Sequence, residues 1–342
     1  MRYRAHAQRH TPALPRRHAF RYRNHMGEFD LIDIINRTVK PPTRALVGIG
    51  DDTAVVKATT PGAQELLCSD CMVEGIHFDL KLMPIQDVAY KAVAACLSDI
   101  AAMNGKPKSV VISLALPKEK ATEKFITQFY QGIAKLQQHI DFDIVGGDLS
   151  SSPGPIFIDV AATGETTHAI LRSGAKPGDV LAVTGSPGAS AAGLYSMQNW
   201  QTIKEINGTL MHAHITPKPR FDIQLTSTCH ALIDISDGLA SEANHIAKAS
   251  NVSIEIKESK IPLHERAKAL AAKTNQSALA WALYGGEDYE LLGAFDPNEP
   301  LPEGFTAIGL VSQATGKPAV TLVKATGESE LLAPRGYDHF SR

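Results

Sequence analysis

The chain has 342 residues, of which 44% are hydrophobic, and its formal net charge is −2. This length suits two domains of ordinary size, and a nearly neutral chain lacks the basic field of a nucleic-acid-binding surface. No apolar run approaches the roughly 20 residues that cross a bilayer. Four cysteines without a secretion signal are too few for a disulfide scaffold. We therefore expect a cytoplasmic protein without nucleic-acid or membrane partners.

Residues 1–25 differ from the rest in composition, because they contain seven arginines, four histidines and no acidic residue. They lack the apolar stretch of a secretory signal. An Arg-rich segment without acids is consistent with an organellar transit peptide or a weak anion-binding tail. We favour a disordered basic extension that precedes a functional start at Met26.

Apolar periodicity predicts alternating strands and helices after this extension. Up to the turn-rich connection near residues 166–178, we expect a short helix after Met26, strands at 65–73, 109–116, 142–145 and 156–163, and helices at 87–103 and 118–139. Beyond it, we expect strands at 180–184, 252–256, 289–295, 306–311 and 319–323, with helices at 219–228, 239–249 and up to 283. The alternation predicts an α/β protein with domains at 26–168 and 169–342.

The motif Gly48-Ile49-Gly50-Asp51-Asp52 follows one short apolar run and precedes another. Adjacent carboxylates in a confined site repel each other, and a hard divalent cation such as Mg²⁺ or Ca²⁺ relieves that repulsion. Taken alone, the motif is at least as typical of a solvated turn, because Gly and Asp are common turn residues.

Acidic residues recur in four further motifs, and most of these motifs end or closely follow a β-like run and are flanked by Gly or Ser. The residues are Asp70, Asp99, Asp148, Asp234 and Asp237. Carboxylates at the ends of several strands indicate a polynuclear metal site. Cys68 and Cys71 form a C-x-x-C pair, but the continuation of the strand places them on opposite faces. We therefore do not expect a redox or zinc site there.

Three other residues leave two interpretations open. His77 is either a structural histidine or a neutral hydrogen-bonding group of the site, since it follows Asp70 by seven residues. Arg172 is either a charge on the connection or a clamp for a phosphate. Tyr130 borders the apolar stripe of a predicted helix, where it packs in the core or faces a ligand.

In order along the chain, the motifs resemble those of bacterial thiamine-monophosphate kinase. The matching segments are Gly48–Asp52, Ser69–Asp70 with Val73–Phe78, Leu97–Met103, Gly146–Asp148, Arg172–Ala175, Asp234–Leu239, Gly285–Leu291 and Gly336–Phe340. Any one of them is weak, whereas the ordered set from Met26 to Phe340 is specific.

This resemblance implies a two-domain fold like that of aminoimidazole ribonucleotide synthetase, with an N-terminal mixed-sheet domain that dimerises and a C-terminal α/β domain. It implies a homodimer that transfers the γ-phosphoryl group of ATP to thiamine monophosphate and gives thiamine diphosphate. The acceptor phosphate is already ionised, so no general base is needed. Positioning and charge neutralisation by several Mg²⁺ ions then carry the in-line transfer.

The resemblance also implies roles for single residues. The metal positions are Asp52, Cys68, Ser69, Asp70, Asp99, Asp148, Asp234 and Asp237, among which Asp52, Asp148 and Asp234 are expected to be the most critical. The nucleotide contacts are Tyr130, Gly147, Asp148, Arg172 and Ser236. The thiamine-phosphate contacts are His77, Glu287 and Tyr337, and Tyr337 is placed to stack on the thiamine rings.

Some positions depart from the family pattern without removing a carboxylate. Cys68 replaces a usual Ser or Thr, Cys96 a common Asn, and Leu149 a common Thr. Two alternatives to the kinase remain. One is a sibling enzyme that acts on an aminoimidazole precursor or on selenide, although residues 26–47 lack the cysteine expected for selenide chemistry. The other is a nucleotide- or thiamine-phosphate-binding sensor without catalysis.

Overall fold

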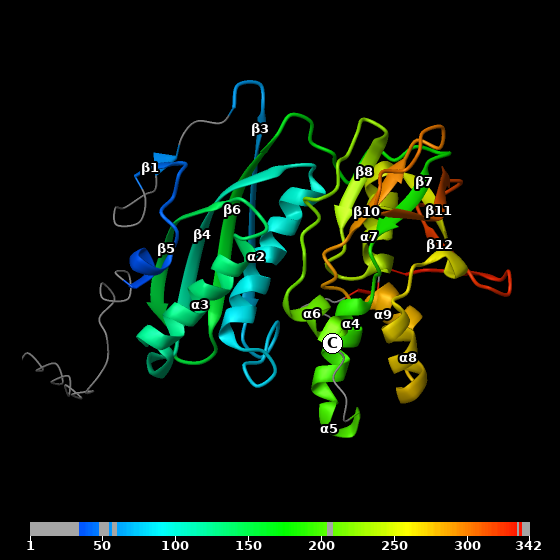
Figure 1. Ribbon diagram of the computed structural model, residues 1–342. Coiled ribbons are helices and arrows are strands. Elements are labelled where there is room, and N and C mark those ends of the chain that lie inside the picture. The colour runs from blue at the N-terminus through cyan, green and yellow to red at the C-terminus, as the bar shows by residue number, and fades with distance from the viewer. Residues whose placement is uncertain (1–33, 48–54, 57–59, 204–207, 334, 337–342) are drawn as a thin grey trace, which may run out of the picture.

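The computed structural model describes residues 34–47, 55–56, 60–203, 208–333 and 335–336. The motif that contains Asp52, and the expected substrate contact Tyr337, lie outside these residues. The described chain has two halves, each with its own sheet, and helix α2 (Ile85–Ala102) lies between the sheets and contacts both (Figure 1). Within the described ranges, no helix combines the length and apolarity of a membrane span.

A four-stranded mixed sheet forms the first half. Its strands are β3 (Gln64–Val73), β4 (Lys106–Leu116), β5 (Asp143–Ser151) and β6 (Phe157–Thr166). They lie in the order β3-β6-β4-β5, where β4 and β5 are parallel and the other neighbours antiparallel. Two short strands, β1 (Ala45–Val47) and β2 (Val55–Val56), pair separately. The predicted mixed sheet is confirmed.

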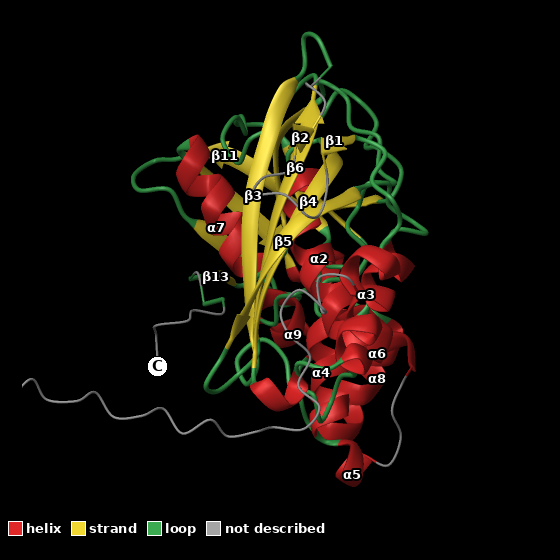
Figure 2. Cartoon of the chain, turned by 90° about the vertical axis from the view of Figure 1, so that its left-hand side faces the viewer, coloured by secondary structure: helices red, strands yellow, loops and turns green. Residues whose placement is uncertain are grey.

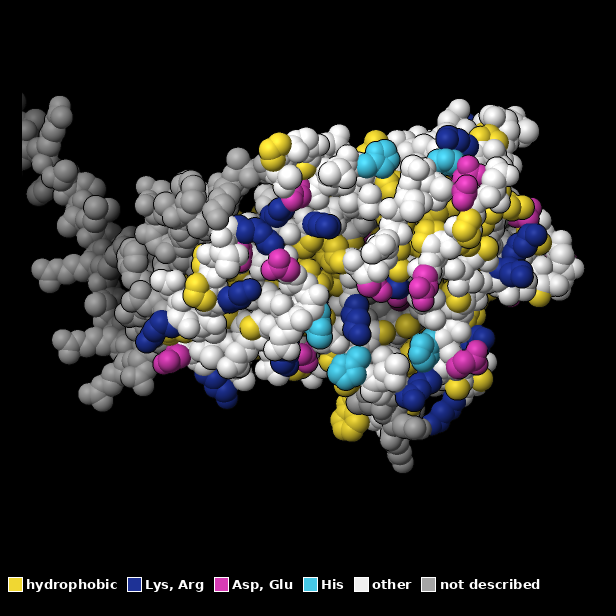
Figure 3. All heavy atoms as spheres, turned by 45° about the horizontal axis from the view of Figure 1, so that its top comes forward, with side chains coloured by type: hydrophobic (Ala, Val, Ile, Leu, Met, Phe, Trp, Pro, Cys, Tyr) yellow, Lys and Arg dark blue, Asp and Glu magenta, His cyan; other side chains and the backbone are white. Residues whose placement is uncertain are grey.

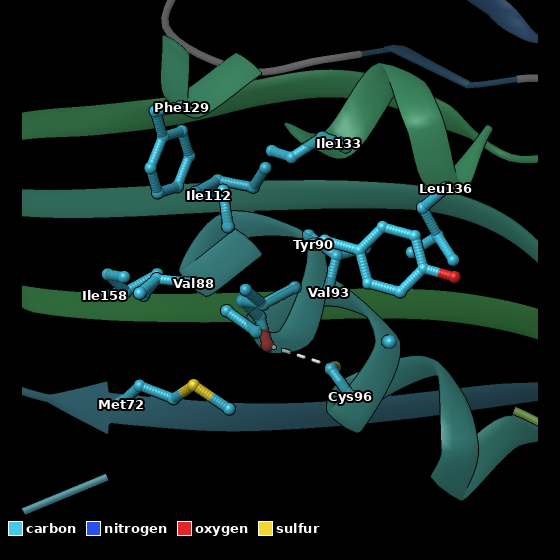
Figure 4. Close-up of a cluster of buried hydrophobic side chains, with 14 of the residues drawn as sticks. Met72, Val88, Tyr90, Val93, Cys96, Ile112, Phe129, Ile133, Leu136 and Ile158 are labelled. Atoms are coloured by element: carbon cyan, nitrogen blue, oxygen red, sulfur yellow. Dashed lines mark hydrogen bonds between the residues drawn. The ribbon is translucent and has the colours of Figure 1, made fainter. Parts of the chain in front are cut away.

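Two helices cover one face of this sheet, namely α2 and α3 (Glu123–Leu136), and they lie on one side of its strands in Figure 2. Alternate residues of the strands point toward them and are buried, whereas their neighbours are less buried. Figure 4 shows the resulting core, in which side chains of α2, α3 and the strands pack together. The labelled residues are Met72, Val88, Tyr90, Val93, Cys96, Ile112, Phe129, Ile133, Leu136 and Ile158.

A seven-stranded sheet forms the second half. Its strands are β7 (Val180–Thr184), β8 (Cys229–Asp234), β9 (Val252–Lys257), β10 (Leu291–Phe295), β11 (Phe305–Gln313), β12 (Val320–Val323) and β13 (Ser329–Leu331). The spatial order is β13-β12-β9-β11-β7-β10-β8, and only β12 and β9 pair in parallel among these described strands. The domain boundary predicted after residue 168 lies in the connection between β6 and β7.

Helices of the second half pack on this sheet and below it. They are α4 (Ala189–Gln198), α5 (Trp200–Ile203), α6 (Gly208–Ile215), α7 (Leu239–Ser250), α8 (Glu265–Thr274) and α9 (Ala278–Tyr284). Helix α7 contacts β8, β9, β10 and β12, and its apolar side contributes to the core of this half. Helices α4, α5, α6 and α8 gather at one end of the molecule (Figure 1). The predicted α/β class is confirmed.

Three predicted elements differ from the structure. The helix expected at 118–139 is a 3₁₀ turn (Lys118–Lys120) followed by α3, because the Thr122 hydroxyl accepts a hydrogen bond from the Phe125 amide and starts the helix anew. The helix expected at 219–228 is irregular. Its apolar residues Phe221, Ile223 and Leu225 are half-buried and alternate with exposed ones, which is the period of an extended chain.

The third difference concerns Gly146-Gly147-Asp148, which we expected to follow a strand but which lies inside β5. A Cβ atom at Gly147 would lie 2.1 Å from the carbonyl oxygen of Ile112 on the neighbouring strand. Glycine therefore allows β4 and β5 to approach closely here. The pairing also shifts register between Val110 and Val111.

The other face of the first sheet carries exposed apolar side chains. Leu67 is 79% exposed, Val111 39% and Phe157 38%, and each alternates with residues that point toward α2 and α3. In the single chain, this face has no helical cover from the described residues. It is an unpaired apolar surface on a sheet that ends at β3 on one side and β5 on the other.

Candidate active site

Two cavities lie where the two halves meet. The first has a volume of about 540 Å³ and is lined by β3, the loop after it, α2, the end of β8 and the loop at 285–289. The second, of about 500 Å³, is lined by β3, the end of α2, the segment at 171–173 and β8. Asp99 and Asp234 line both cavities, so two carboxylates stand at their junction.

The first cavity extends around the outer edge of β3. Asp70 and Met72 point toward α2, whereas Ser69 and Cys71 point to the opposite face, yet all four line the cavity. Ser69 Oγ donates a hydrogen bond to Asp159 Oδ1 at 3.0 Å, which ties the strand to β6. Both faces of this edge strand therefore contribute to one site.

Asp99 and Asp234 come from opposite halves of the chain. Asp99 lies in the last turn of α2, and Asp234 is the last residue of β8. The neighbouring Ser98 hydroxyl donates a 2.7 Å hydrogen bond to Asp234 Oδ2. Burial, followed by the charges of Asp234 and Asp70, raises the pKa of Asp99 to about 7. Burial likewise raises the pKa of Asp234 to about 6, against the opposing influence of Ser98. Two carboxylates whose ionisation is disfavoured by burial therefore stand at the junction of the cavities.

Ser236 and Asp237 follow Asp234 in a loop that is hydrogen-bonded to α7. Glu242 Oε1 accepts hydrogen bonds from the Asp237 amide at 3.0 Å and from Ser236 Oγ at 3.4 Å. Its other oxygen, Oε2, is buried without a hydrogen-bond partner among the described residues. Burial raises the pKa of Glu242 to about 8. Glu242 therefore supports the loop that presents Ser236 and Asp237 to the cavity.

The loop at 285–289 closes the first cavity from the second half. Gly286 has a φ of +68°, and a Cβ there would lie 2.4 Å from the Ser236 carbonyl oxygen, so the turn requires glycine. Glu287 also has a positive φ, +56°, and its amide donates to that same oxygen at 2.7 Å. The Asp288 carboxylate accepts hydrogen bonds from the amides of Gly188 and Ser190. These contacts fix the loop with the Glu287 side chain lining the cavity.

His77 lies across the first cavity in the loop after β3. Its Nδ1 accepts a hydrogen bond from the Val73 amide at 3.0 Å, so the proton of the neutral ring is on Nε2. This ring is therefore oriented as a hydrogen-bond donor.

The second cavity has a more apolar lining. Arg172 lines it beside Leu66, Leu171 and Ile233, together with the two shared aspartates. Arg172 lines this cavity together with Asp99 and Asp234, and its positive charge opposes the rise in the pKa of both carboxylates. Cys68 lines this cavity too, but its thiol is turned onto α2, where it donates to the Cys96 carbonyl at 3.3 Å.

The structure thus brings together most of the predicted site residues. Ser69, Asp70, His77, Asp99, Asp234, Ser236, Asp237 and Glu287 line the first cavity, and Cys68, Asp99, Arg172 and Asp234 line the second. Figure 3 shows acidic, basic and apolar side chains interspersed on the face it presents.

Three predicted residues are not gathered in the single chain. Tyr130 is 3% exposed on α3 and packs edge-on against Phe129, within the core of the first half. Gly147 and Asp148 lie on β5, at the opposite edge of the sheet from Asp70 on β3. Three strand spacings separate these edges, about 14 Å. None of the three lines either cavity.

Sequence reasoning missed two residues beside Glu287, namely Lys91 and His214. Lys91 is completely buried on α2, and its Nζ lies 2.7 Å from Glu287 Oε1 and 3.2 Å from His214 Nε2. A signal for Lys91 was present, because it is a single cation among the small apolar residues of that helix. No comparable pattern marks His214.

The donor set of the first cavity suits Mg²⁺. Carboxylates are its preferred protein ligands, and it commonly takes one or two of them together with water and substrate phosphates. Among the described residues, no three His, Cys, Asp or Glu side chains are already close enough to hold an ion by themselves. Burial raises the pKa of Asp99 and Asp234 against the opposing charge of Arg172, so a divalent cation would favour the ionised form of both carboxylates. The residues therefore fit an ion that is shared with phosphate oxygens.

Comparisons with protein-family models match both halves of the chain. Residues 50–166 match AIR synthase related protein, N-terminal domain, and residues 176–300 match AIR synthase related protein, C-terminal domain. These matches confirm the predicted two-part fold.

Curated relatives match almost the whole chain. Thiamine-monophosphate kinase of Bacillus subtilis is 40% identical over 332 residues, which cover 92% of this chain and 100% of the relative. The kinase of Escherichia coli K12 is 36% identical and covers 92% of this chain and 98% of its own length.

Solved structures give the same result. AaThiL complexed with AMPPCP and TMP is 34% identical with a TM-score of 0.74, and the match covers 94% of this chain and 100% of that one. Thiamine-monophosphate kinase from Stenotrophomonas maltophilia is 28% identical with a TM-score of 0.74, covering 88% and 96%. The hydrogenase maturation protein HypE, 18% identical with a TM-score of 0.64, shares the fold over 91% of this chain and 98% of its own.

Proposed function

Because the chain belongs to the thiamine-monophosphate kinase family, we propose that it transfers the γ-phosphoryl group of ATP to the phosphate of thiamine monophosphate. The products are thiamine diphosphate and ADP. The observation that carries this proposal is the junction of two cavities at Asp99 and Asp234. Two polyanionic substrates, one in each cavity, meet at these shared carboxylates.

The linings of the two cavities favour one assignment of the substrates. The second cavity combines apolar walls with Arg172, which suits a nucleoside and its phosphates. The first combines the hydrogen-bond donor His77, the acid Glu287 and apolar side chains such as Met197. This lining suits a ligand with a cationic ring and a phosphate, as thiamine monophosphate is. We therefore place ATP in the second cavity and the acceptor in the first, an assignment that does not use Ser236 as a nucleotide contact, since Ser236 lines the first cavity.

The chemistry requires positioning more than proton transfer. The acceptor phosphate is ionised near neutral pH, so it needs no general base. Asp70, Asp99 and Asp234 are the described residues that would hold Mg²⁺, and Ser69 and Asp237 extend this set. Bound Mg²⁺ neutralises the phosphate oxygens and stabilises the charge of the transferred group. The roles of Asp52 and Tyr337 remain predictions, since both lie outside the described residues.

Asp148 joins the proposed site only if it comes from a second copy of the chain. In the register of the sheet, Asp148 pairs with Ser113, Ser113 with Asp159, and Asp159 with Cys71. Side chains directly opposite each other share a face, so Asp148 points to the open face, away from α2. The first cavity reaches that face at the edge of β3, through Ser69 and Cys71.

We therefore propose a homodimer in which the open sheet faces cover each other. The exposed Leu67, Val111 and Phe157 on this face support such packing. The β5 edge of one copy then lies near the β3 edge of the other, and Asp148 approaches Ser69 and Asp70 of its partner. A cytoplasmic location is part of this proposal, and it fits the four cysteines, all of which are free thiols in the structure.

Incubation with ATP, Mg²⁺ and thiamine monophosphate tests the function. We expect thiamine diphosphate and ADP in equal amounts, with free thiamine unreactive because it lacks the acceptor phosphate. Asp234→Asn keeps the size of the side chain and is expected to lower kcat at least about 100-fold. Asp222→Asn, at a position with a 67% exposed side chain, is the control.

A folded protein that binds ATP but forms no thiamine diphosphate would contradict the kinase and favour the sensor. Product formed at an unchanged rate by the Asp234 variant would contradict the assigned role of the two-cavity junction. Turnover of an aminoimidazole precursor or of selenide instead of thiamine monophosphate would favour a sibling enzyme.

A further inference from the structure

Lys91 is a completely buried lysine at the boundary between the two halves of the chain. It lies on α2 among buried residues that include Val88, Ala92 and Ala95, and its side chain has no exposed surface. Its ammonium group pairs with Glu287 Oε1 at 2.7 Å. Burying an ammonium group is strongly unfavourable unless a partner compensates its charge. The only anion that pairs with it among the described residues is Glu287.

His214 accompanies this pair without adding charge. Its Nε2 lies 3.2 Å from Lys91 Nζ, and its Nδ1 lies 3.0 Å from Ser190 Oγ. Lysine can only donate, so Nε2 accepts and Nδ1 carries the proton toward Ser190. Burial and the charge of Lys91 lower the pKa of His214 to about 3, so the ring is neutral at physiological pH. One ammonium and one carboxylate therefore balance each other beside a neutral ring.

Glu287 is the charged member of this network that lines the cavity, where the neutral His214 lies beside it. Its side chain is 28% exposed, whereas those of Lys91 and His214 are 0% and 3% exposed. Its backbone is already fixed by the positive φ and by the hydrogen bond to Ser236. Lys91 adds a further constraint, since it holds one carboxylate oxygen from the other half of the chain, while His214 Nδ1 lies 3.6 Å from the other oxygen.

We propose that Lys91 is a positioning residue, which holds the Glu287 carboxylate ionised and aimed into the first cavity for the cationic ring of the acceptor. This inference rests on the proposed function, because the acceptor assigned to that cavity carries a positively charged thiazolium ring. Lys91 itself touches no substrate. Its charge reaches the acceptor through Glu287, and the ATP cavity, which contains neither residue, is unaffected.

Kinetics of Lys91→Met, Glu287→Gln and the double variant test the proposal. We expect Lys91→Met to raise KM for thiamine monophosphate about tenfold and to change KM for ATP less than about twofold. In the Glu287→Gln background, the same change should add less than about twofold, because the residue through which Lys91 acts is already altered. Lys91→Arg keeps the charge and should give an intermediate KM. Lys124→Met, at an exposed lysine of α3, is the control.

Equal increases in both KM values would overturn the proposal, and so would a Lys91→Met effect of the same size with and without Glu287. If Lys91→Met does not fold, the double variant, which leaves no unpaired charge, carries the test. A KM for thiamine monophosphate about tenfold above that of Glu287→Gln would then overturn the proposal.

Calorimetric binding of thiamine monophosphate in the presence of a non-hydrolysable ATP analogue separates this inference from the function. Wild-type protein that binds thiamine monophosphate without turnover contradicts the kinase but leaves Lys91 testable through Kd, which should rise about tenfold in Lys91→Met. An unchanged Kd in that variant overturns the role of Lys91 alone. Absence of both binding and turnover in the wild type overturns both proposals.

Discussion

Asp99→Asn should stabilise the metal-free protein, and increasingly so as the pH rises. The pKa of Asp99 in the folded protein is about 7, raised from 3.8 first by burial and then by Asp234 and Asp70. A carboxyl group with a raised folded pKa favours folding at low pH, and this stability is lost as the pH rises through about 7. Asparagine does not ionise, so the Asp99→Asn variant does not lose this stability as the pH rises.

The size of the effect follows from the pKa difference. Each pKa unit corresponds to about 1.4 kcal/mol, so ionised Asp99 destabilises the metal-free protein by roughly 4 kcal/mol well above pH 7. Between pH 5 and pH 8, the loss grows by roughly 3 kcal/mol. For a domain of about 150–250 residues, a change of 1 kcal/mol in the free energy of unfolding shifts Tm by about 2–4 °C. The Tm of Asp99→Asn should therefore gain about 6–12 °C on the wild type over this pH range.

Thermal and urea unfolding at pH 5 and pH 8 in the presence of EDTA measure this gain. A titration with Mg²⁺ at pH 8 should raise the Tm of the wild type more than that of the variant, because Asp99 is one of the carboxylates that fit the ion. Asp141→Asn, at a position with a 78% exposed side chain, controls for the change in net charge. Equal loss of stability from pH 5 to pH 8 in Asp99→Asn and the wild type would refute the reasoning, as would equal stabilisation by Mg²⁺.

Two further predictions concern β5. Gly147→Ala should destabilise the protein by about 1–3 kcal/mol, because its Cβ would lie 2.1 Å from the Ile112 carbonyl oxygen. Gly146→Ala, with open space around the new Cβ, should change Tm little. Equal Tm values for the two variants would contradict the close approach of β4 and β5. Asp70→Asn and Asp148→Asn should each be inactive as purified, but when the two are mixed and reassembled, about a quarter of wild-type activity should return, since half of the dimers would contain one intact site. A mixture as inactive as its components would show that Asp148 does not act across a dimer.

The sequence predicted the gathering of Asp99, Asp234 and Asp237 because each of these three stands at or just after the end of a helix or strand. Asp234 ends β8, Asp237 follows in the next loop, and Asp99 lies in the last turn of α2. Apolar periodicity locates such ends to within a few residues. Their convergence in one cavity is what the repetition of the motif indicated.

The placement of Asp148 was not predictable in this way. It depends on β5 continuing through two glycines and on a register shift between Val110 and Val111, neither of which alters the apolar pattern. A one-residue change of register moves a side chain to the other face of a sheet. Sequence patterns therefore indicated that Asp148 belongs to a site but not that it lies at the far edge of the sheet.

Lys91 was missed for a different reason. A lysine in a helix is normally assigned to the solvent, because its charge is rarely buried completely. Its partner Glu287 lies nearly 200 residues away in the other half of the chain. Only the packing of α2 against the second half brings the two together.

The contacts of α2 with the second half also have a consequence for protein engineering. Ser98 with Asp234, and Lys91 with Glu287, join side chains that chain recombination would inherit from different parents. A chimera that exchanges one half for that of a distant relative would mismatch these pairs even if each half folded correctly. Chimeras within this family should therefore fold and function best when α2 and the loops of the second half that contact it come from the same parent.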